Sequence, residues 1–124
     1  MSLLLDTHVV LWWREDSPRL GKAVRDAISN TDLVYVSAAS AWEVSIKRRL
    51  GKLRIPGPFE QAVDDSGFAK LAVEFAHAEQ VADLPDHHAD PFDRLLVAQA
   101  GVEGLTIVTH DRRFEPYGVP ALWV

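Results

Sequence analysis

Apolar and polar residues follow each other along the chain in short blocks that predict alternating strands and helices. Apolar and β-branched runs predict strands in LLLDT (3–7), DLVYVS (32–37), LTIVTHD (105–111) and VPALWV (119–124). A helical period predicts helices over about 18–29, from Ser37 to Gly51, over 58–66 and 75–83, and from 91 onward. Such alternation is typical of a parallel sheet covered by helices. We therefore expect a three-layer α/β/α domain around a mainly parallel sheet of four to five strands.

Two of these helices carry start signals. Ser17 is expected to cap the helix over about 18–29, with Pro18 at its first position. Asp90 is expected to cap the helix from 91 onward, with Pro91 at its first position. Asp93 then falls at the third helical position. The side of this last helix that should face the core carries Leu95, Leu96, Ala98 and Val102.

Length and composition limit the class of protein. The 124 residues are 48% hydrophobic, which suits a single domain spanning 1–124. Cysteine is absent, so a disulfide-stapled scaffold and a thiolate metal site are excluded, and a reducing, cytoplasmic location is expected. The apolar N-terminal run is interrupted by Asp6 and His8, so we expect neither a signal peptide nor a membrane span.

The net charge of −5 is unevenly distributed. Residues 1–54 contain nine Lys/Arg and six Asp/Glu, whereas 55–124 contain four and twelve. The segment KRRLGKLR (47–54) concentrates five of the basic residues. It is either a phosphate-binding surface or a solvated helix end whose cations oppose the helix dipole.

Four carboxylates are expected to meet at one edge of the sheet. Asp6 and Asp111 each end a predicted strand, and the carboxyl ends of parallel strands lie at the same edge. Glu43 and Asp93, early in two helices, are expected to face that edge as well. Such a group of acids needs cations, and oxygen ligands favour Mg²⁺ or Mn²⁺ over Zn²⁺. The chemistry indicated is metal-assisted phosphoryl transfer.

Each acid also has a purely structural interpretation. Asp90 and Asp93 can simply stabilise the start of a helix, and Glu43 can form an i,i+4 pair with Lys47 worth only about 0.3 kcal/mol. A purely structural role is harder to assign to Asp6 and Asp111, because an acid at the end of an apolar strand is costly to desolvate. Asp90 is expected to act as a cap and not as a direct ligand.

The histidines suggest a rival, histidine-rich zinc hydrolase. No H-x-x-x-H helix pair is present, and strand alternation predicts that His8 and His110 point away from Asp6 or into a loop. His87 and His88 are expected on an exposed loop before the last helix, at the border of the groove that holds the acids. The tryptophans are interpreted as core or dimer interface, with base stacking as the alternative, at Trp12, Trp13 and Trp42.

Four segments together resemble the PIN-domain family, and within it the VapC-type toxins of bacterial type II toxin–antitoxin pairs. They are LLLDTHVVLWW, SAASAWEVSIKRRLGKL, HHADPFDRLLVAQA and TIVTHDRRF, which span nearly the whole chain. The resemblance implies that the family's four acids are Asp6, Glu43, Asp93 and Asp111. It also implies a Mg²⁺- or Mn²⁺-dependent endoribonuclease, a homodimer, and inhibition by a VapB-type antitoxin.

On this interpretation the RNA substrate contacts basic residues near the acids, namely Lys47, Arg48, Arg112 and Arg113. One alternative is a catalytically inactive PIN-like module that binds RNA or protein, against which the intact set of acids argues. Another is an aspartyl-phosphate enzyme, but its commonest form has D-x-D after the first strand, and here residue 8 is His.

Overall fold

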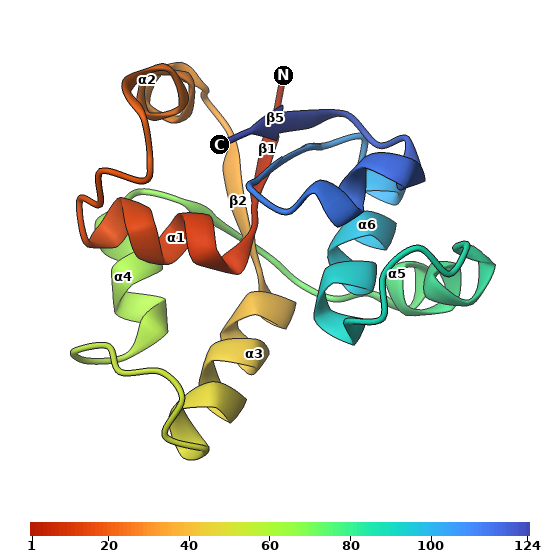
Figure 1. The fold of residues 1–124 in the computed structure, drawn as a ribbon, viewed down its shortest axis with the longest axis horizontal. Coiled ribbons are helices and arrows are strands. Elements are labelled where there is room, and N and C mark those ends of the chain that lie inside the picture. The colour runs from red at the N-terminus through yellow and green to blue at the C-terminus, as the bar shows by residue number, and fades with distance from the viewer.

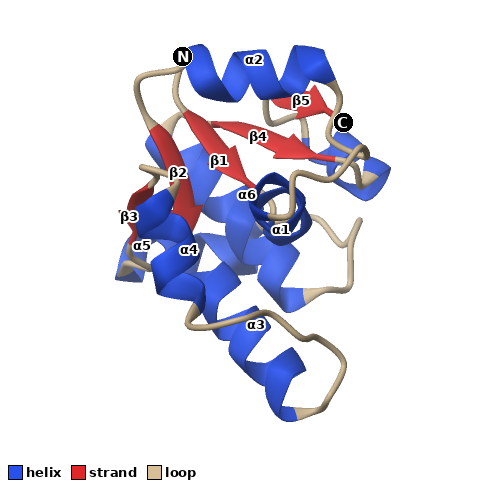
Figure 2. Cartoon of the chain, turned by 90° about the vertical axis from the view of Figure 1, so that its left-hand side faces the viewer, coloured by secondary structure: helices blue, strands red, loops and turns tan.

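A five-stranded, wholly parallel sheet forms the centre of the computed structural model, which describes residues 1–124. The strands are β1 (Leu3–Leu5), β2 (Val34–Ser37), β3 (Ala69–Leu71), β4 (Thr106–Thr109) and β5 (Ala121–Trp123). Their order is β3-β2-β1-β4-β5 (Figure 2). The chain therefore builds outward from β1 in both directions, which makes the β1/β4 boundary a switch point of the topology. Sites of parallel α/β proteins form beyond the carboxyl ends of strands at such a boundary.

Helices cover both faces of the sheet, as the sequence predicts (Figure 1). They are α1 (Thr7–Arg14), α2 (Lys22–Asn30), α3 (Ala38–Arg49), α4 (Phe59–Asp65), α5 (Phe75–Gln80) and α6 (Pro91–Glu103), with short 3₁₀ segments η1 (Val81–Asp83) and η2 (Arg112–Tyr117). Helices α1, α2 and α4 lie on one side of the sheet, and α5 and α6 on the other. None of these helices has the length and apolar character needed to span a membrane.

Strand β1 divides the core into two apolar clusters. Leu3 and Leu5 point to the face covered by α1, α2 and α4, whereas Leu4 points to the face covered by α6. All three side chains are completely buried. A strand buried on both faces needs an uninterrupted apolar run, and LLL supplies it. The first polar residue after this run, Asp6, is therefore delivered to the edge of the sheet.

Helix α6 begins as predicted. The Oδ1 atom of Asp90 accepts hydrogen bonds from the backbone N–H groups of Phe92 (2.8 Å) and Asp93 (3.1 Å), and Pro91 occupies the first helical position. The predicted core side of α6 is only partly correct, because Val102 is exposed and Leu95 is only partly buried. The helix buries a face shifted from the expected one, made of Leu96, Val97, Ala98, Gln99 and Ala100.

The N-terminal third differs most from the prediction. Residues Thr7–Arg14 form α1, which the sequence interpretation does not include. The helix predicted from Pro18 begins only at Lys22 and is capped by Gly21. Ser17 accepts a hydrogen bond from the N–H of Arg19 (3.2 Å), so its hydroxyl stabilises the turn before the helix. Strand β3 and segment η2 are also absent from the prediction.

Candidate active site

Asp6 lies between β1 and α1 and is 4% exposed. Its backbone carbonyl accepts the first hydrogen bonds of α1, from Val9 and Val10. Its side chain does not cap the helix; Oδ2 instead accepts a 2.7 Å hydrogen bond from the hydroxyl of Thr109. Burial raises the pKa of Asp6 despite this bond and the nearby imidazoles of His8 and His110. The side chain of Asp6 is therefore a buried carboxylate that does not cap the helix.

Glu43 comes to the same region from α3 and is also 4% exposed. Its Oε1 accepts a 2.7 Å hydrogen bond from the hydroxyl of Thr7, and its Oε2 lies 2.7 Å from Nζ of Lys47. The i,i+4 pair expected from the sequence is therefore present. The acid of this pair is buried, whereas Lys47 is partly exposed. Glu43 in turn raises the pKa of Lys47 by hydrogen bonding.

Asp93 and Asp111 are held by one buried histidine. Nε2 of His88 lies 2.9 Å from Oδ2 of Asp93 and 3.1 Å from Oδ2 of Asp111. Its other ring nitrogen accepts from the backbone N–H of Asp90 (3.2 Å), which places the ring proton on Nε2. The expectation that His88 lies on an exposed loop is wrong, because the backbone N–H of His88 is fixed by the hydroxyl of Tyr117 (2.9 Å) and the side chain is buried. His87 is exposed, as expected.

The carboxylate of Asp111 is held by hydrogen bonds from Arg113 and His88. Burial acts to raise its pKa, but hydrogen bonds from Arg113 and His88 outweigh burial and hold the pKa well below its usual range. Arg113 contacts both oxygens, with Nη2 at 2.8 Å from Oδ2 and Nε at 3.0 Å from Oδ1. The backbone N–H of Asp111 donates to the Thr109 hydroxyl (3.0 Å). Thr109 therefore connects Asp6 and Asp111.

Hydrogen bonds and electrostatics link the four predicted acids. Thr109 joins Asp6 to Asp111, and His88 joins Asp111 to Asp93. Burial, together with the negative charges of the other three acids and of Asp90, raises the pKa of Asp93 to about 8. Lys47 and Arg113 are the cations that ion-pair with members of this group. A set of carboxylate oxygens with so much uncompensated negative charge suits a hard divalent cation. The donor chemistry of the site therefore fits a metal ion.

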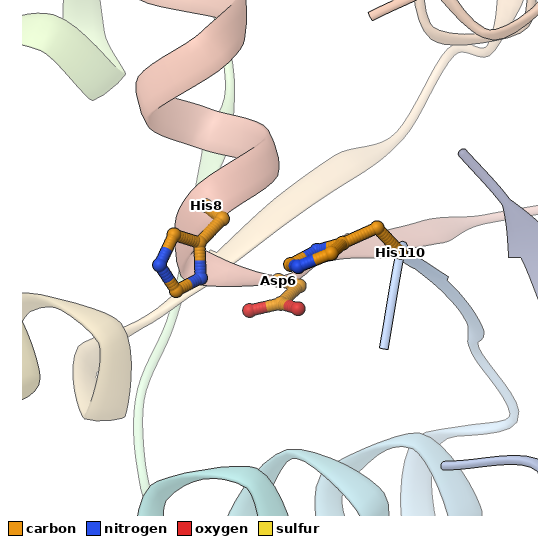
Figure 3. A group of neighbouring side chains, drawn as sticks. All are labelled: Asp6, His8 and His110. Carbon is orange, nitrogen blue, oxygen red and sulfur yellow. The ribbon is translucent and has the colours of Figure 1, made fainter. Parts of the chain in front are cut away.

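His8 and His110 also belong to this edge of the sheet (Figure 3). One ligand atom from each of Asp6, His8 and His110 lies within 4.8 Å of the other two. Of the two predicted placements, away from Asp6 or in a loop, the first is not found for either histidine. The second holds for His110, which follows the end of β4, but not for His8, which lies in α1. Strand alternation does not apply to them, because β1 ends at Leu5 and β4 ends at Thr109. A second such group consists of His88, Asp93 and Asp111.

The predicted basic residues are only partly gathered at the acids. Lys47 and Arg113 lie there, whereas the guanidinium of Arg48 donates to the carbonyl of Gly57 (2.8 Å). Arg112 stacks over the ring of Trp123, with 4.3 Å between the guanidinium carbon and the ring centroid. The role of these four residues in RNA binding stays a prediction.

The tryptophans divide into two kinds. Trp12 and Trp13 are partly buried and pack against the larger core cluster, in line with a core role. Trp42 is 61% exposed, so it does not belong to the core; its ring packs edge-on against Phe92 at 5.1 Å between centroids.

Sequence reasoning did not single out Thr7 and Thr109, although both hold site acids. Each lies within two residues of a strand-end acid, in the sequences DTH (6–8) and THD (109–111). A hydroxyl beside a buried acid is the signal that would have found them, since a buried carboxylate needs donors.

The fold is that of a parallel α/β protein with acids beyond the ends of β1 and β4, at the switch point of its sheet. Comparison with known proteins gives the family. Residues 3–119 match the PIN domain model, and the chain belongs to the PIN-domain family.

Individual relatives agree with this assignment. The chain is 30% identical over 123 residues to Ribonuclease VapC22 of Mycobacterium tuberculosis, covering 96% of this chain and 94% of that protein. Two solved structures share the fold. VapBC2 from Rickettsia felis, bound to a promoter DNA fragment, has a TM-score of 0.73 at 15% identity, covering 98% of this chain and 97% of that one. A toxin–antitoxin complex from Klebsiella pneumoniae has a TM-score of 0.67 at 16% identity, covering 98% and 96%.

Proposed function

We propose that the chain is a metal-dependent endoribonuclease and the toxin of a toxin–antitoxin pair. The observation that carries this proposal is that Asp6, Glu43 and Asp111 lie close enough to Asp93, beyond the ends of β1 and β4, for their charges to act on it. Burial first, and then these charges, raise the pKa of Asp93 to about 8. A protein has no structural need to bear such repulsion. Membership of the PIN-domain family and the 30% identity to a protein named a ribonuclease support the choice of RNA as substrate.

The metal in this proposal is Mg²⁺ or Mn²⁺, held by the four acids. When bound, the cation supplies a Lewis acid that polarises the phosphodiester and makes a water molecule a better nucleophile. The chain itself fixes the ligands in advance. Thr109 orients Asp6, Thr7 orients Glu43, and His88 holds Asp93 beside Asp111. Because these donors are in place before the metal arrives, little reorganisation is needed on binding.

Basic residues are proposed to contact the RNA backbone. Arg113 and Arg112 have side chains exposed by 67% and 66%, directly after Asp111. Lys47 and Arg48 lie in the last turn of α3, on the same helix as Glu43. Contacts of this kind weaken as salt rises, because they release counterions from the phosphates.

The proposed partner is a VapB-type antitoxin. The likeness in fold to a toxin–antitoxin complex from Klebsiella pneumoniae supports this proposal. Pairing of two copies of this chain stays a prediction.

RNA cleavage by the purified, metal-stripped protein tests the proposed activity. We expect cleavage to appear on addition of Mg²⁺ or Mn²⁺ and to be lost in Asp6→Asn and Glu43→Gln. Asp86→Asn is the matched control, because the side chain of Asp86 is fully exposed and forms its ion pair with Arg94 (3.6 Å), outside the four acids. Cleavage by Asp6→Asn at the wild-type rate would contradict the proposal.

A further inference from the structure

Asp6, His8 and His110 form a group of ligand-type side chains that shares only Asp6 with the set of four carboxylates. One ligand atom from each lies within 4.8 Å of the other two. Figure 3 shows the two imidazole rings flanking the Asp6 carboxylate, with a ring nitrogen of His8 turned toward it. We refer to these three residues as the Asp6–His8–His110 group.

The fold itself brings the three residues together. Helix α1 begins directly after Asp6, so His8 falls in its first turn. Strand β4 pairs in parallel with β1, with Leu5 opposite Val108, so the residues that follow both strands lie side by side. His110 is therefore placed next to Asp6. The ring of Trp12 packs behind both imidazoles, with centroids 4.8 Å from His110 and 6.0 Å from His8.

The nitrogen and oxygen atoms of this group are free to bind a ligand. Neither imidazole takes part in a side-chain hydrogen bond, and both rings are exposed. Asp6 uses Oδ2 to accept from Thr109, and Oδ1 has no hydrogen-bond partner. An ion can thus enter from solvent and meet the Oδ1 atom of Asp6 and two unoccupied imidazoles.

The imidazole nitrogens of this group favour a different metal from the one that suits the four carboxylates. Two imidazoles and one carboxylate are a usual ligand set for Zn²⁺ with an open fourth position, whereas Mg²⁺ prefers oxygen ligands. Zn–N bonds of about 2.0–2.1 Å require ligand atoms roughly 3.4 Å apart. Binding therefore requires the ligand atoms, now within 4.8 Å of one another, to move closer together.

We propose that the Asp6–His8–His110 group binds a first-row transition-metal dication, with Zn²⁺ as the preferred ion. Asp6 is shared with the four-carboxylate set, so Zn²⁺ in this group competes for a ligand of the Mg²⁺ site. That consequence, but not the binding itself, rests on the proposed function. Zn²⁺ would then inhibit Mg²⁺-dependent cleavage of RNA.

Metal titration of the stripped full-length protein, without RNA, tests the binding. The variants are His8→Asn and His110→Asn, with His87→Asn as the matched control, since His87 is an exposed histidine outside the group. We expect Zn²⁺, measured by calorimetry, to bind at least about tenfold more weakly to the first two and normally to the control. Co²⁺ used in place of Zn²⁺ should show a visible absorption band that the first two variants lose. Mg²⁺ affinity should be unchanged in all three.

Circular dichroism establishes that each variant is folded, and His8→Gln provides a second variant at the same position. Equal Zn²⁺ affinity in the wild type and both group variants would overturn the proposal. So would unchanged Zn²⁺ binding together with lost RNA binding, because that result would assign the rings and Trp12 to base stacking. Because the titration contains no RNA, a protein that fails to cleave RNA can still confirm or refute this site.

Discussion

The hydroxyl of Thr109 donates a 2.7 Å hydrogen bond to the carboxylate of Asp6, across 103 positions of sequence. Both side chains are almost inaccessible to solvent. The bond joins the ends of β1 and β4, the two central strands at which the topology changes direction. Like the 2.7 Å hydrogen bond from Thr7 to Glu43, it fixes an acid of the candidate site through a buried hydroxyl.

Replacing Thr109 with the nearly isosteric Val should therefore weaken both the fold and the metal site. The buried Asp6 carboxylate loses its donor, which we expect to lower the free energy of unfolding by about 1–3 kcal/mol. Affinity for Mg²⁺ should also fall, because the ligand is no longer oriented. Urea denaturation and calorimetry measure the two effects. Thr106→Val, on the same strand but partly exposed, is the control, and an equal loss in the control would refute a special role for Thr109.

The raised pKa of Asp93 makes the stability of the metal-free protein depend on pH. Its pKa is about 8 in the folded chain and near 3.8 when unfolded, so between these values the folded state binds more protons. The contribution of Asp93 to stability is thus fully present below about pH 4 and is lost as the pH rises toward 8.

Asp93→Asn removes this loss. We expect the variant to gain about 1–3 kcal/mol relative to the wild type at about pH 8, and little at about pH 4. Denaturation curves at several pH values, in the presence of a chelator, measure the difference. In saturating Mg²⁺ the wild type should be the more stable of the two proteins, because Mg²⁺ stabilises only the chain that binds it well. Parallel pH profiles of the two proteins would contradict this account.

His88 should act as a positioning residue for two of the acids. In His88→Ala, Asp93 and Asp111 lose their common donor and are free to separate, so affinity for Mg²⁺ should fall by about tenfold or more. His88→Gln, which retains a side-chain donor, should recover part of that affinity. Calorimetry distinguishes this role from a purely structural one, since a loss of stability without a change in metal affinity would refute positioning.

Arg113 should act on the site through Asp111 as well as on RNA. Arg113→Lys keeps the positive charge but loses the two-point contact with the carboxylate. We expect it to bind RNA almost normally while cleaving about tenfold more slowly. Arg49→Lys, at an exposed position in the last turn of α3, is the control. A reduction in RNA binding alone, with an unchanged turnover rate, would show that Arg113 serves only as a phosphate contact.

The main features of the fold and the acids were predictable because they depend on simple rules. Apolar runs ending in Asp6 and Asp111 predict parallel strands whose ends meet at one edge. Asp90 and Pro91 predict the start of α6 and hence the place of Asp93. In the structure Asp6, Glu43 and Asp111 lie close enough to Asp93 for their charges to raise its pKa, whereas their role as metal ligands stays a prediction.

The features that the sequence did not predict depend on where the strands end, and the pattern of apolar residues defines strand ends poorly. The segment THVVLWWR is rich in β-branched and aromatic residues, so its helical propensity is low, yet tertiary packing makes it α1. His8 consequently follows helix geometry and lies beside Asp6, not on the opposite face of a strand. His88 is buried through contacts with Tyr117 and Asp111, which are distant in sequence. No local pattern encodes such contacts.

Calorimetric titration of Mg²⁺ into the metal-free protein tests the central claim most directly, because Mg²⁺ favours carboxylate ligands over imidazoles. The account predicts saturable binding to the wild type and to Asp86→Asn, and binding at least about tenfold weaker to Asp93→Asn. Equal Mg²⁺ binding by the wild type and Asp93→Asn, or none by the wild type, would contradict it.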